Sequence, residues 1–369
     1  MSTRCADGPS PGRGNTAGSE VALIGAFPPP VGGQAIYNQR LAEELVARGI
    51  PVVPVDVSSR ALDTDLPATR RRLVTLLASR RFSVYHLSIS DTRVVGFEVI
   101  VGLASVLRRT PFVYNILAGR FAQRVAGYSL PHRFLLCWAL RRAGRILVSN
   151  EMMATCVRAL PFLSRAKVEV IGCKLPLGVE PTQDPDIARF LESGNPAIVA
   201  IGAMRTVYGF DLLVRACAVL QAGGLRPRLL AIVSGEGDPA AQQACEEAMR
   251  EAGPLLQVTI RRDLPREVVL GAIRGAHVLA RPTRADGDSL SVHEAQTLGT
   301  PVVASDAAPR PQGVILHRSD DPVSLAAAIR EAIASSSSRM PEGVGVGDAV
   351  LVDRVAACYR SLCPERGRV

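Results

Sequence analysis

The sequence predicts an α/β protein made of two Rossmann-like domains, each built on a doubly wound parallel sheet. Short apolar runs, typical of strands buried on both faces, alternate with helical patterns along the chain. This alternation stops near residue 175 in a stretch of turn-forming residues and starts again at residue 197. A chain of 369 residues also exceeds the usual size of one hydrophobic core, so two domains are expected.

The first half contains strand patterns separated by helical patterns. Strands are predicted at residues 21–26, 51–57, 82–87, 111–116, 144–149 and 168–171, and helices at 34–48, 69–81, 96–107 and 130–142. Gly32 and Gly33 precede the first helix, where the lack of side chains lets a ligand approach free backbone N–H groups. His86 ends a strand at the edge where open α/β sheets bind ligands. A structural histidine at a strand end fits this sequence equally well.

The second half repeats the alternation. Strands are predicted at residues 197–202, 228–233, 258–260, 276–279, 301–304 and 314–317. One helix is predicted to end at residue 221, and further helices are predicted at 240–252, 266–275, 290–298, 322–334 and 349–362. Residues 176–195 between the halves are poor in core residues. The predicted domains are therefore 20–180 and 196–345, with a disordered tail at 1–19 and a helical segment at 346–369.

Residues 276–306 carry the strongest functional signal: a strand, a polar loop, a helix, a tight turn and a strand. Asp288, Ser289 and Ser291 stand where short polar side chains cap a helix N-terminus, and Gly299 stands where a helix ends. A helix N-terminus suits a phosphate group, and a loop carboxylate such as Asp286 suits sugar hydroxyls. The alternative interpretation is a capping loop with two solvated carboxylates.

The net charge of +9 is concentrated between residues 101 and 170. This segment has eleven basic residues: Arg108, Arg109, Arg120, Arg124, Arg133, Arg141, Arg142, Arg145, Arg158, Arg165 and Lys167. Only Glu151 and Glu169 oppose them, and apolar and aromatic residues lie between them. The pattern predicts contact with an anionic membrane surface or an anionic acceptor. Core helices with solvated arginines are the alternative, and no nucleic-acid motif accompanies the charge.

The remaining composition limits the class of protein. The first twenty residues lack the apolar segment of a secretory signal, and no apolar run is long enough to span a bilayer. The eight cysteines form no CxxC pair, and no Cys/His cluster has metal-binding spacing. The sequence therefore predicts a cytoplasmic protein with no metal site, and the basic segment predicts peripheral attachment to the inner face of the membrane.

Seven residues separate Asp286 from Glu294, and Ala295, Gly299 and the run Pro-Val-Val at 301–303 follow. This pattern resembles the donor site of the family-4 glycosyltransferases, whose GT-B fold places two Rossmann-like domains across a cleft. The resemblance implies a retaining, metal-independent hexosyltransferase with a UDP- or GDP-type sugar donor and no other cofactor. The acceptor would be a hydroxyl group of a polysaccharide, a lipid-linked glycoconjugate or a natural product. It also implies that residues 346–369 cross back to the first domain.

The resemblance assigns roles to individual residues. Asp286 would contact the donor sugar near its reacting carbon, and Glu294 would hold the ribose. The candidate catalytic residues are Asp286, Gly33, Asn115 and His86, and the candidate donor-binding residues are Glu294, Arg205, Gly32, Gly235, Gly237, Asp288, Ser289, Leu290 and Ser291.

The sequence departs from the family pattern at the residues that bind the diphosphate of the donor. The family's arginine and lysine for this group fall on Ala203 and Tyr208, and Asn115 stands near its usual histidine. Arg205 is the nearest basic residue, and Arg281, Arg284 and Arg310 are further candidates to compensate. These departures keep two alternatives open: a catalytically inactive GT-B-like binding or scaffold subunit, and a GT-B nucleotide-sugar epimerase.

Overall fold

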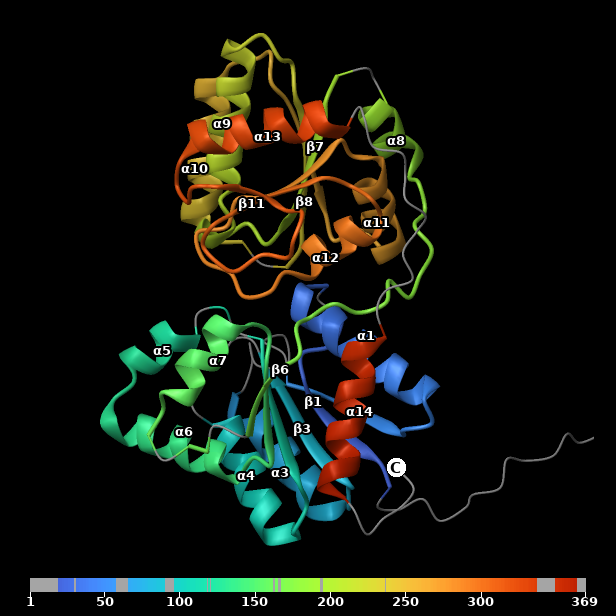
Figure 1. The fold of residues 1–369 in the computed structure, drawn as a ribbon, viewed down its shortest axis with the longest axis vertical. Helices are drawn as coiled ribbons and strands as arrows, with labels where there is room; N and C mark the ends of the chain where they lie inside the picture. Colours follow the sequence, from blue (N-terminus) through green and yellow to red (C-terminus); the bar gives the residue numbers. More distant parts are fainter. Residues whose placement is uncertain are drawn as a thin grey trace, which may run out of the picture.

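The structure, a computed structural model, describes residues 19–29, 31–57, 66–89, 96–117, 119, 121–161, 163–164, 167–192, 195–235, 237–336 and 349–363. These residues form two lobes, each a six-stranded parallel sheet with helices packed on both faces (Figure 1). The predicted α/β class and the two doubly wound sheets are therefore confirmed. Nearly all of the predicted tail lies outside the described residues.

The first lobe has strand order β2-β1-β3-β4-β5-β6. Its elements are β1 (Val21–Gly25), α1 (Gly33–Ala47), β2 (Val52–Asp56), α3 (Leu66–Ser79), β3 (Val84–Ile89), α4 (Phe97–Arg108), β4 (Phe112–Ile116), α5 (Phe121–Gly127), α6 (Leu130–Arg142), β5 (Arg145–Val148), α7 (Glu151–Arg158) and β6 (Val168–Val170). Strands β1, β3 and β4 are buried along their whole length, because helices cover both faces of the sheet.

The second lobe has strand order β12-β11-β10-β7-β8-β9. Its elements are α8 (Pro185–Glu192), β7 (Ala197–Gly202), the 3-10 turn η2 (Thr206–Tyr208), α9 (Phe210–Ala222), β8 (Arg228–Val233), α10 (Pro239–Ala252), β9 (Gln257–Arg262), α11 (Arg266–Gly275), β10 (Val278–Arg281), α12 (Leu290–Thr297), β11 (Val302–Ser305), β12 (Ile315–His317) and α13 (Pro322–Ser336). Helix α12 of this lobe contacts α1 of the first lobe. The carboxyl ends of the two sheets therefore meet at the lobe junction.

Helices α5, α7 and α8 are elements that the sequence analysis did not predict. Helix α8 lies in the passage that was expected to be irregular. Its start carries ordinary helix signals: Asp184 accepts hydrogen bonds from the N–H groups of Asp186 and Ile187, and Pro185 is the first helical residue. Ile187 and Leu191 are buried, which places the apolar face of this short helix against the second lobe.

The last helix, α14 (Val350–Leu362), returns to the first lobe and lies beside α1 (Figure 1). Its buried residues belong to one apolar cluster with β1, β3 and α1. Tyr359 is fully buried, and its hydroxyl forms a hydrogen bond with Nδ1 of His86. Burial lowers the pKa of His86 to about 3, so this histidine is neutral in the folded protein. No helix in the described part of the chain combines the length and apolar character needed to cross a membrane.

The docking of α14 gives a prediction for stability. Tyr359→Ala removes a fully buried aromatic ring, so we expect it to lower the free energy of unfolding of the first lobe by about 3–5 kcal/mol. Fluorescence of the single tryptophan, Trp138 in α6, reports unfolding of this lobe in urea. The exposed neighbour Arg360→Ala is the control and should change stability by less than about 0.5 kcal/mol. Equal stability of both variants would contradict the packing described.

Candidate functional site at the lobe junction

The loop between β10 and α12 is pressed directly against the first lobe. The backbone N–H of Cys173, which follows β6, donates a hydrogen bond to Oδ2 of Asp288 at 2.9 Å. Gly119, which follows β4, packs against the same loop: a Cβ atom at this position would lie 2.2 Å from the carbonyl carbon of Asp286 and 2.3 Å from the nitrogen of Gly287. Only glycine fits there without a backbone shift, so the loop is held by two points of the first lobe.

Helix α12 begins without the predicted side-chain cap. The side chain of Ser289 does not cap the helix, because its Oγ lies 3.1 Å from Oγ of Ser291 instead. Asp288 is turned toward Cys173 and His293 rather than toward the helix start. The prediction that these side chains cap α12 is therefore wrong. The first N–H groups of the helix keep the partial positive charge that attracts phosphate.

Helix α1 of the first lobe presents a similar N-terminus. Gly32 is its N-cap and makes no side-chain cap, and the first turn contains no acidic residue. A Cβ atom built on Gly32 or Gly33 would meet nothing within 4 Å. No described atom therefore crowds these two glycines, and contact of their backbone with a ligand stays a prediction.

Asp286 is held by two arginines. Its Oδ2 accepts from Nε of Arg281 at 3.0 Å and from Nη1 of Arg310 at 2.9 Å, and the hydroxyl of Thr283 lies 3.3 Å away. Burial raises the pKa of Asp286, but Arg281 and then Arg310 lower it more, so the net pKa lies well below the usual value and the carboxylate stays charged. The alternative of a solvated carboxylate does not describe Asp286.

Glu294, on α12, is also buried and paired. Its side chain is 5% exposed, and its Oε1 lies 2.7 Å from Nη1 of Arg266 at the start of α11. Besides this ion pair, Arg266 donates a hydrogen bond to the carbonyl of Leu177, in the passage between the lobes, at 3.1 Å. The second carboxylate of the motif is thus connected to the interlobe segment, a link that nothing in the sequence indicated.

Ala203 and Tyr208 stand at the two positions where the sequence analysis expected basic residues, and the ring of Tyr208 lies beside Arg281. The ring of Tyr208 packs on Gly202, where a Cβ atom would lie 2.2 Å from the ring. The guanidinium of Arg281 lies 5.0 Å from the centre of this ring. Arg281 and Arg310 together carry two positive charges against the single charge of Asp286, so the cluster has one excess positive charge.

The other two candidate arginines differ from each other. Arg284 is bound to Asp211 and Asp320 at 2.7 and 2.6 Å, so its charge is already neutralised. Arg205 is exposed at the start of η2, and among the described residues it has no ion-pair partner. Arg205, Arg281 and Arg310 therefore remain as possible sources of charge for a diphosphate.

The remaining predicted residues divide into two groups. Gly235 and Gly237 follow β8; Gly235 has φ +69° and its N–H donates to Asp263 Oδ1 at 3.1 Å, while a Cβ atom on Gly237 would touch Met204. Leu290 is the first residue of α12 and is partly buried. These positions lie at the carboxyl end of the second sheet, and their role beside a nucleotide stays a prediction.

His86 and Asn115 are the exceptions. His86 is buried under α14 and contacts Tyr359, which removes it from the candidate catalytic set. Asn115 is fully buried, and its amide donates to the hydroxyl of Tyr37 on α1 at 3.2 Å. Asn115 therefore holds α1 through this hydrogen bond, and its amide is not exposed at the lobe junction.

The ion pairs of Asp286 predict that the free energy of unfolding depends on pH, with a definite sign. The native pKa of Asp286 is lowered, so its stabilising contribution is complete above the unfolded pKa of about 4 and is lost as the pH falls toward the native pKa. Asp286→Asn should lower the free energy of unfolding by about 3 kcal/mol at pH 6, because it leaves two buried arginines unpaired. The difference should be about 1 kcal/mol smaller at pH 3, as measured by urea unfolding followed by circular dichroism.

The control for this experiment is Asp186→Asn. Asp186 lies on α8 and pairs with Arg189 on the exposed surface, so its removal should cost less than about 0.5 kcal/mol at either pH. A stability difference for Asp286→Asn that grows on acidification would contradict the assignment of a charged, ion-paired carboxylate.

Comparison with known proteins agrees with this geometry. Residues 195–335 match the family model described as "Glycosyl transferases group 1". A D-inositol 3-phosphate glycosyltransferase of Mycolicibacterium smegmatis is 28% identical over 166 residues, which are 44% of this chain and 38% of the relative. D-inositol 3-phosphate glycosyltransferase 1 of Catenulispora acidiphila is 29% identical over 240 residues, 59% of this chain and 57% of the relative. The matches thus span between about two fifths and three fifths of these relatives.

Solved structures share the fold over nearly the whole chain. Anabaena HepE in complex with UDP and glucose superposes with a TM-score of 0.67 at 15% identity and covers 93% of this chain and 100% of HepE. Sucrose-phosphate synthase of Thermosynechococcus elongatus gives a TM-score of 0.67 at 19% identity, covering 94% and 97%. A putative UDP-N-acetylglucosamine 2-epimerase of Listeria monocytogenes gives 0.63 at 14%, covering 95% and 98%. The chain has the GT-B fold, and its second lobe matches the model of the group 1 glycosyltransferases.

Proposed function

We propose that this protein is a retaining glycosyltransferase that moves a sugar from a nucleotide-diphosphate sugar to a hydroxyl acceptor. One observation carries the proposal: a charged Asp286 and a buried Glu294 flank the uncapped N-terminus of α12, at the junction with the glycine N-terminus of α1. Anabaena HepE, which shares this fold, was solved with UDP and glucose, and this supports a UDP-type donor.

The chemistry follows from what these groups bind. The diphosphate would lie between the N-termini of α1 and α12, whose N–H groups and helix dipoles stabilise negative charge. Asp286 would accept hydrogen bonds from sugar hydroxyls, and Glu294 would accept them from the ribose. In front-face transfer the leaving diphosphate takes the proton of the acceptor hydroxyl, so the protein supplies orientation and charge stabilisation rather than a separate base.

Arg281 and Arg310 would replace the family's basic residues. Both guanidinium groups bind Asp286 in this structure. A bound diphosphate offers the same bidentate hydrogen-bond geometry with more negative charge, so the arginines would divide their hydrogen bonds between phosphate and carboxylate. Asp286 would then have capacity to accept hydrogen bonds from the sugar.

The test begins with a thermal-shift screen against UDP- and GDP-sugars, which would identify the donor. Nucleotide release is then measured with and without acceptor alcohols. A donor that stabilises the protein and releases nucleotide only in the presence of an acceptor supports transfer. A donor sugar converted to its epimer without acceptor would support the epimerase alternative, which the likeness to the Listeria protein favours. Binding without any turnover would support the inactive subunit, which Ala203 and Tyr208 favour.

For the transferase, Asp286→Asn is the decisive substitution. We expect kcat to fall by about 100-fold or more, because the variant removes a charged hydrogen-bond acceptor from the reacting sugar. Initial rates of nucleotide release with saturating donor measure the effect, and Asp186→Asn on the exposed surface of α8 is the matched control. Full activity in a folded Asp286→Asn variant would refute the role assigned to this carboxylate.

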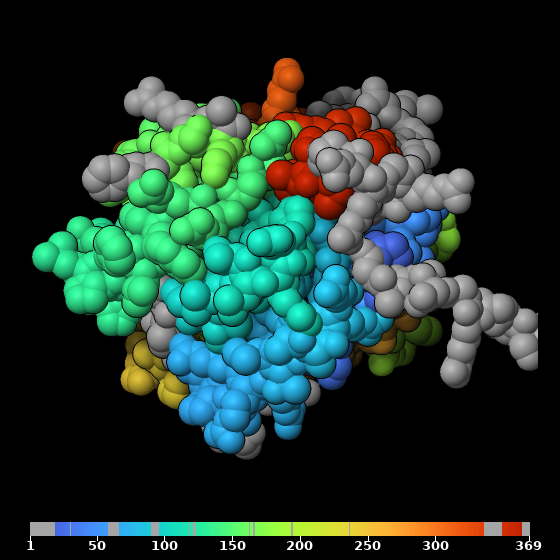
Figure 2. All heavy atoms as spheres, turned by 90° about the horizontal axis from the view of Figure 1, so that it is seen from below, coloured from blue at the N-terminus to red at the C-terminus, as the bar shows by residue number. Residues whose placement is uncertain are grey.

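The acceptor of this transferase would be anionic or lipid-linked, as in polysaccharide or glycoconjugate assembly. Figure 2 shows the face of the first lobe that is turned away from the second lobe, to which α3, α4 and α6 contribute. Helices α4 and α6 carry strongly exposed apolar side chains, including Leu107 (80% exposed), Leu130 (79%) and Phe134 (71%). Five arginines lie on or directly beside the same helices: Arg108, Arg109, Arg133, Arg141 and Arg142. Arg120 and Arg165 of the basic segment lie outside the described residues. Apolar side chains among arginines suit an anionic membrane surface on the cytoplasmic side.

This membrane contact predicts that the protein co-sediments with phosphatidylglycerol vesicles at low salt, binds them less at high salt and does not bind phosphatidylcholine vesicles. The double variant Leu107→Ser/Phe134→Ser should bind at least about fivefold more weakly, because it removes the apolar contacts. Leu255→Ser on the second lobe is the control, since Leu255 is also 80% exposed. Equal binding by the double variant and the control would show that these helices do not contact the membrane.

A further inference from the structure

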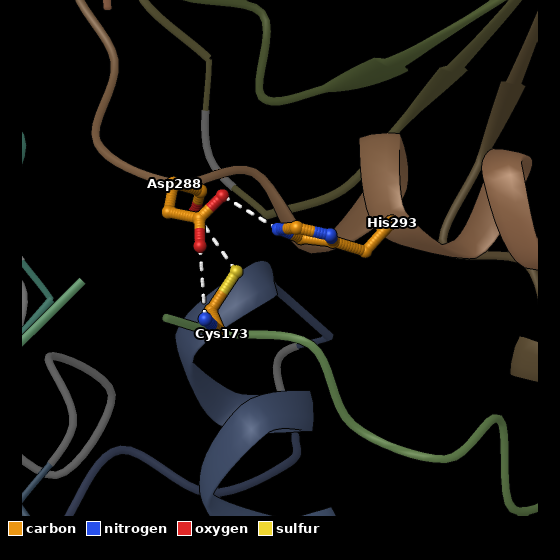
Figure 3. A group of neighbouring side chains, drawn as sticks. All are labelled: Cys173, Asp288 and His293. Carbon is orange, nitrogen blue, oxygen red and sulfur yellow. Dashed lines mark hydrogen bonds and ion pairs between the residues drawn. The ribbon is translucent and has the colours of Figure 1, made fainter. Parts of the chain in front are cut away.

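Three side chains with different metal-binding atoms meet where the lobes touch. Cys173 follows β6 in the first lobe, Asp288 lies in the loop before α12, and His293 lies on α12 (Figure 3). The sulfur, a carboxylate oxygen and a ring nitrogen all lie within 4.8 Å of one another. Cys173 is buried, and the side chains of Asp288 and His293 are 11% and 13% exposed.

Hydrogen bonds already hold the three groups in place. Nε2 of His293 lies 2.6 Å from Oδ1 of Asp288, and the Cys173 thiol donates to the main-chain oxygen of Asp288 at 3.2 Å. The backbone N–H of Cys173 donates to Oδ2 of Asp288. The side-chain atoms therefore converge without a large rearrangement, and the thiol proton and any proton shared by His293 and Asp288 are the ones that a cation would displace.

We propose that Cys173, Asp288 and His293 form a binding site for a divalent cation of the zinc type that bridges the two lobes. Thiolate, imidazole and carboxylate are the three ligand types that Zn²⁺ prefers, and a water molecule completes a tetrahedron. On binding, the thiol gives its proton to solvent and the sulfur forms the bond to the metal, so the step is a ligand exchange without oxidation.

Cation binding at this site requires Cys173 to lose its proton. Burial, and then the nearby charge of Asp288, raise the pKa of the Cys173 thiol well above its usual range. The thiol therefore stays protonated when no cation is present, and a divalent charge at the site reverses this preference. Sequence spacing gave no sign of the site, because Asp288 lies 115 positions after Cys173 in the chain.

The position of the site predicts what the cation does. Its ligands come from both lobes, so the ion binds the arrangement in which the lobes are in contact and stabilises that arrangement relative to an open one. Separation of the lobes would expose the buried thiol and give the ion its path of entry. The cation is thus a regulator of lobe opening, and no step of sugar transfer needs it.

The test is a titration of the chelator-treated full-length protein with Co²⁺ and then Zn²⁺, without any sugar donor. We expect one equivalent of Co²⁺ to give the intense visible bands of a tetrahedral site and a sulfur-to-cobalt charge-transfer band, and Zn²⁺ to displace it. Cys173→Ser should abolish the charge-transfer band, and His293→Gln should weaken affinity by at least about tenfold. Zn²⁺ should also raise the thermal midpoint of the wild type, because the three ligands come together only in the folded form.

Matched controls are Cys156→Ser on α7 and His132→Gln on α6, which lie outside the cluster and should leave the titration unchanged. If Cys173→Ser fails to fold by circular dichroism, His293→Gln decides the outcome alone. The absence of a tetrahedral spectrum at one equivalent, or an unchanged spectrum and affinity in the folded cluster variants, would overturn the proposal and leave a hydrogen-bonded interlobe contact. The titration contains no donor, so its result is independent of the proposed transferase activity.

Discussion

The structure depends most on the way the loop before α12 is fixed from both sides. From the second lobe, Arg281 and Arg310 hold the carboxylate of Asp286. From the first lobe, Gly119 contacts its backbone and Cys173 donates to Asp288. A loop with several charged and polar residues would otherwise be mobile, because few apolar contacts hold it. These contacts fix the direction of the Asp286 carboxylate before any ligand arrives, and such preorganisation is what electrostatic catalysis requires.

Much of the fold could be predicted from the sequence because parallel sheets covered on both faces leave a simple pattern. The strand VALIG of β1 and the run LLAIV that follows Arg228 in β8 are continuous apolar runs, and both strands are buried along their length. Helix α8 was missed for the opposite reason: it is short, and the turn formers around it concealed the Asp184-Pro185 start signal. Local pattern predicts long amphipathic elements well and short ones in turn-rich segments poorly.

The site was predictable only in part, because sequence spacing reports neighbours along the chain and not partners across space. The spacing of Asp286 and Glu294 identified the loop and the helix. It gave no sign of Arg310 as a partner of Asp286, of Arg266 as a partner of Glu294, or of Cys173 beside Asp288. The predicted cap on α12 failed for a related reason: Asp288 had a better partner on the other lobe than the helix start beside it. Long-range hydrogen bonds override local capping preferences where two lobes meet.

Under the proposed function, the arginines beside Asp286 supply the positive charge that Ala203 and Tyr208 do not provide. Tyr208 occupies the position of the lysine, but its ring supports the guanidinium of Arg281, and cation–π contact holds that charge beside the same turn. The cluster of Arg281, Arg310 and Asp286 keeps one excess positive charge. An arginine also binds phosphate bidentately, whereas lysine acts as a point charge. The lack of basic residues at 203 and 208 is therefore compatible with the donor site proposed above, since the electrostatic field at the N-termini of α1 and α12 depends on where the charges lie in space.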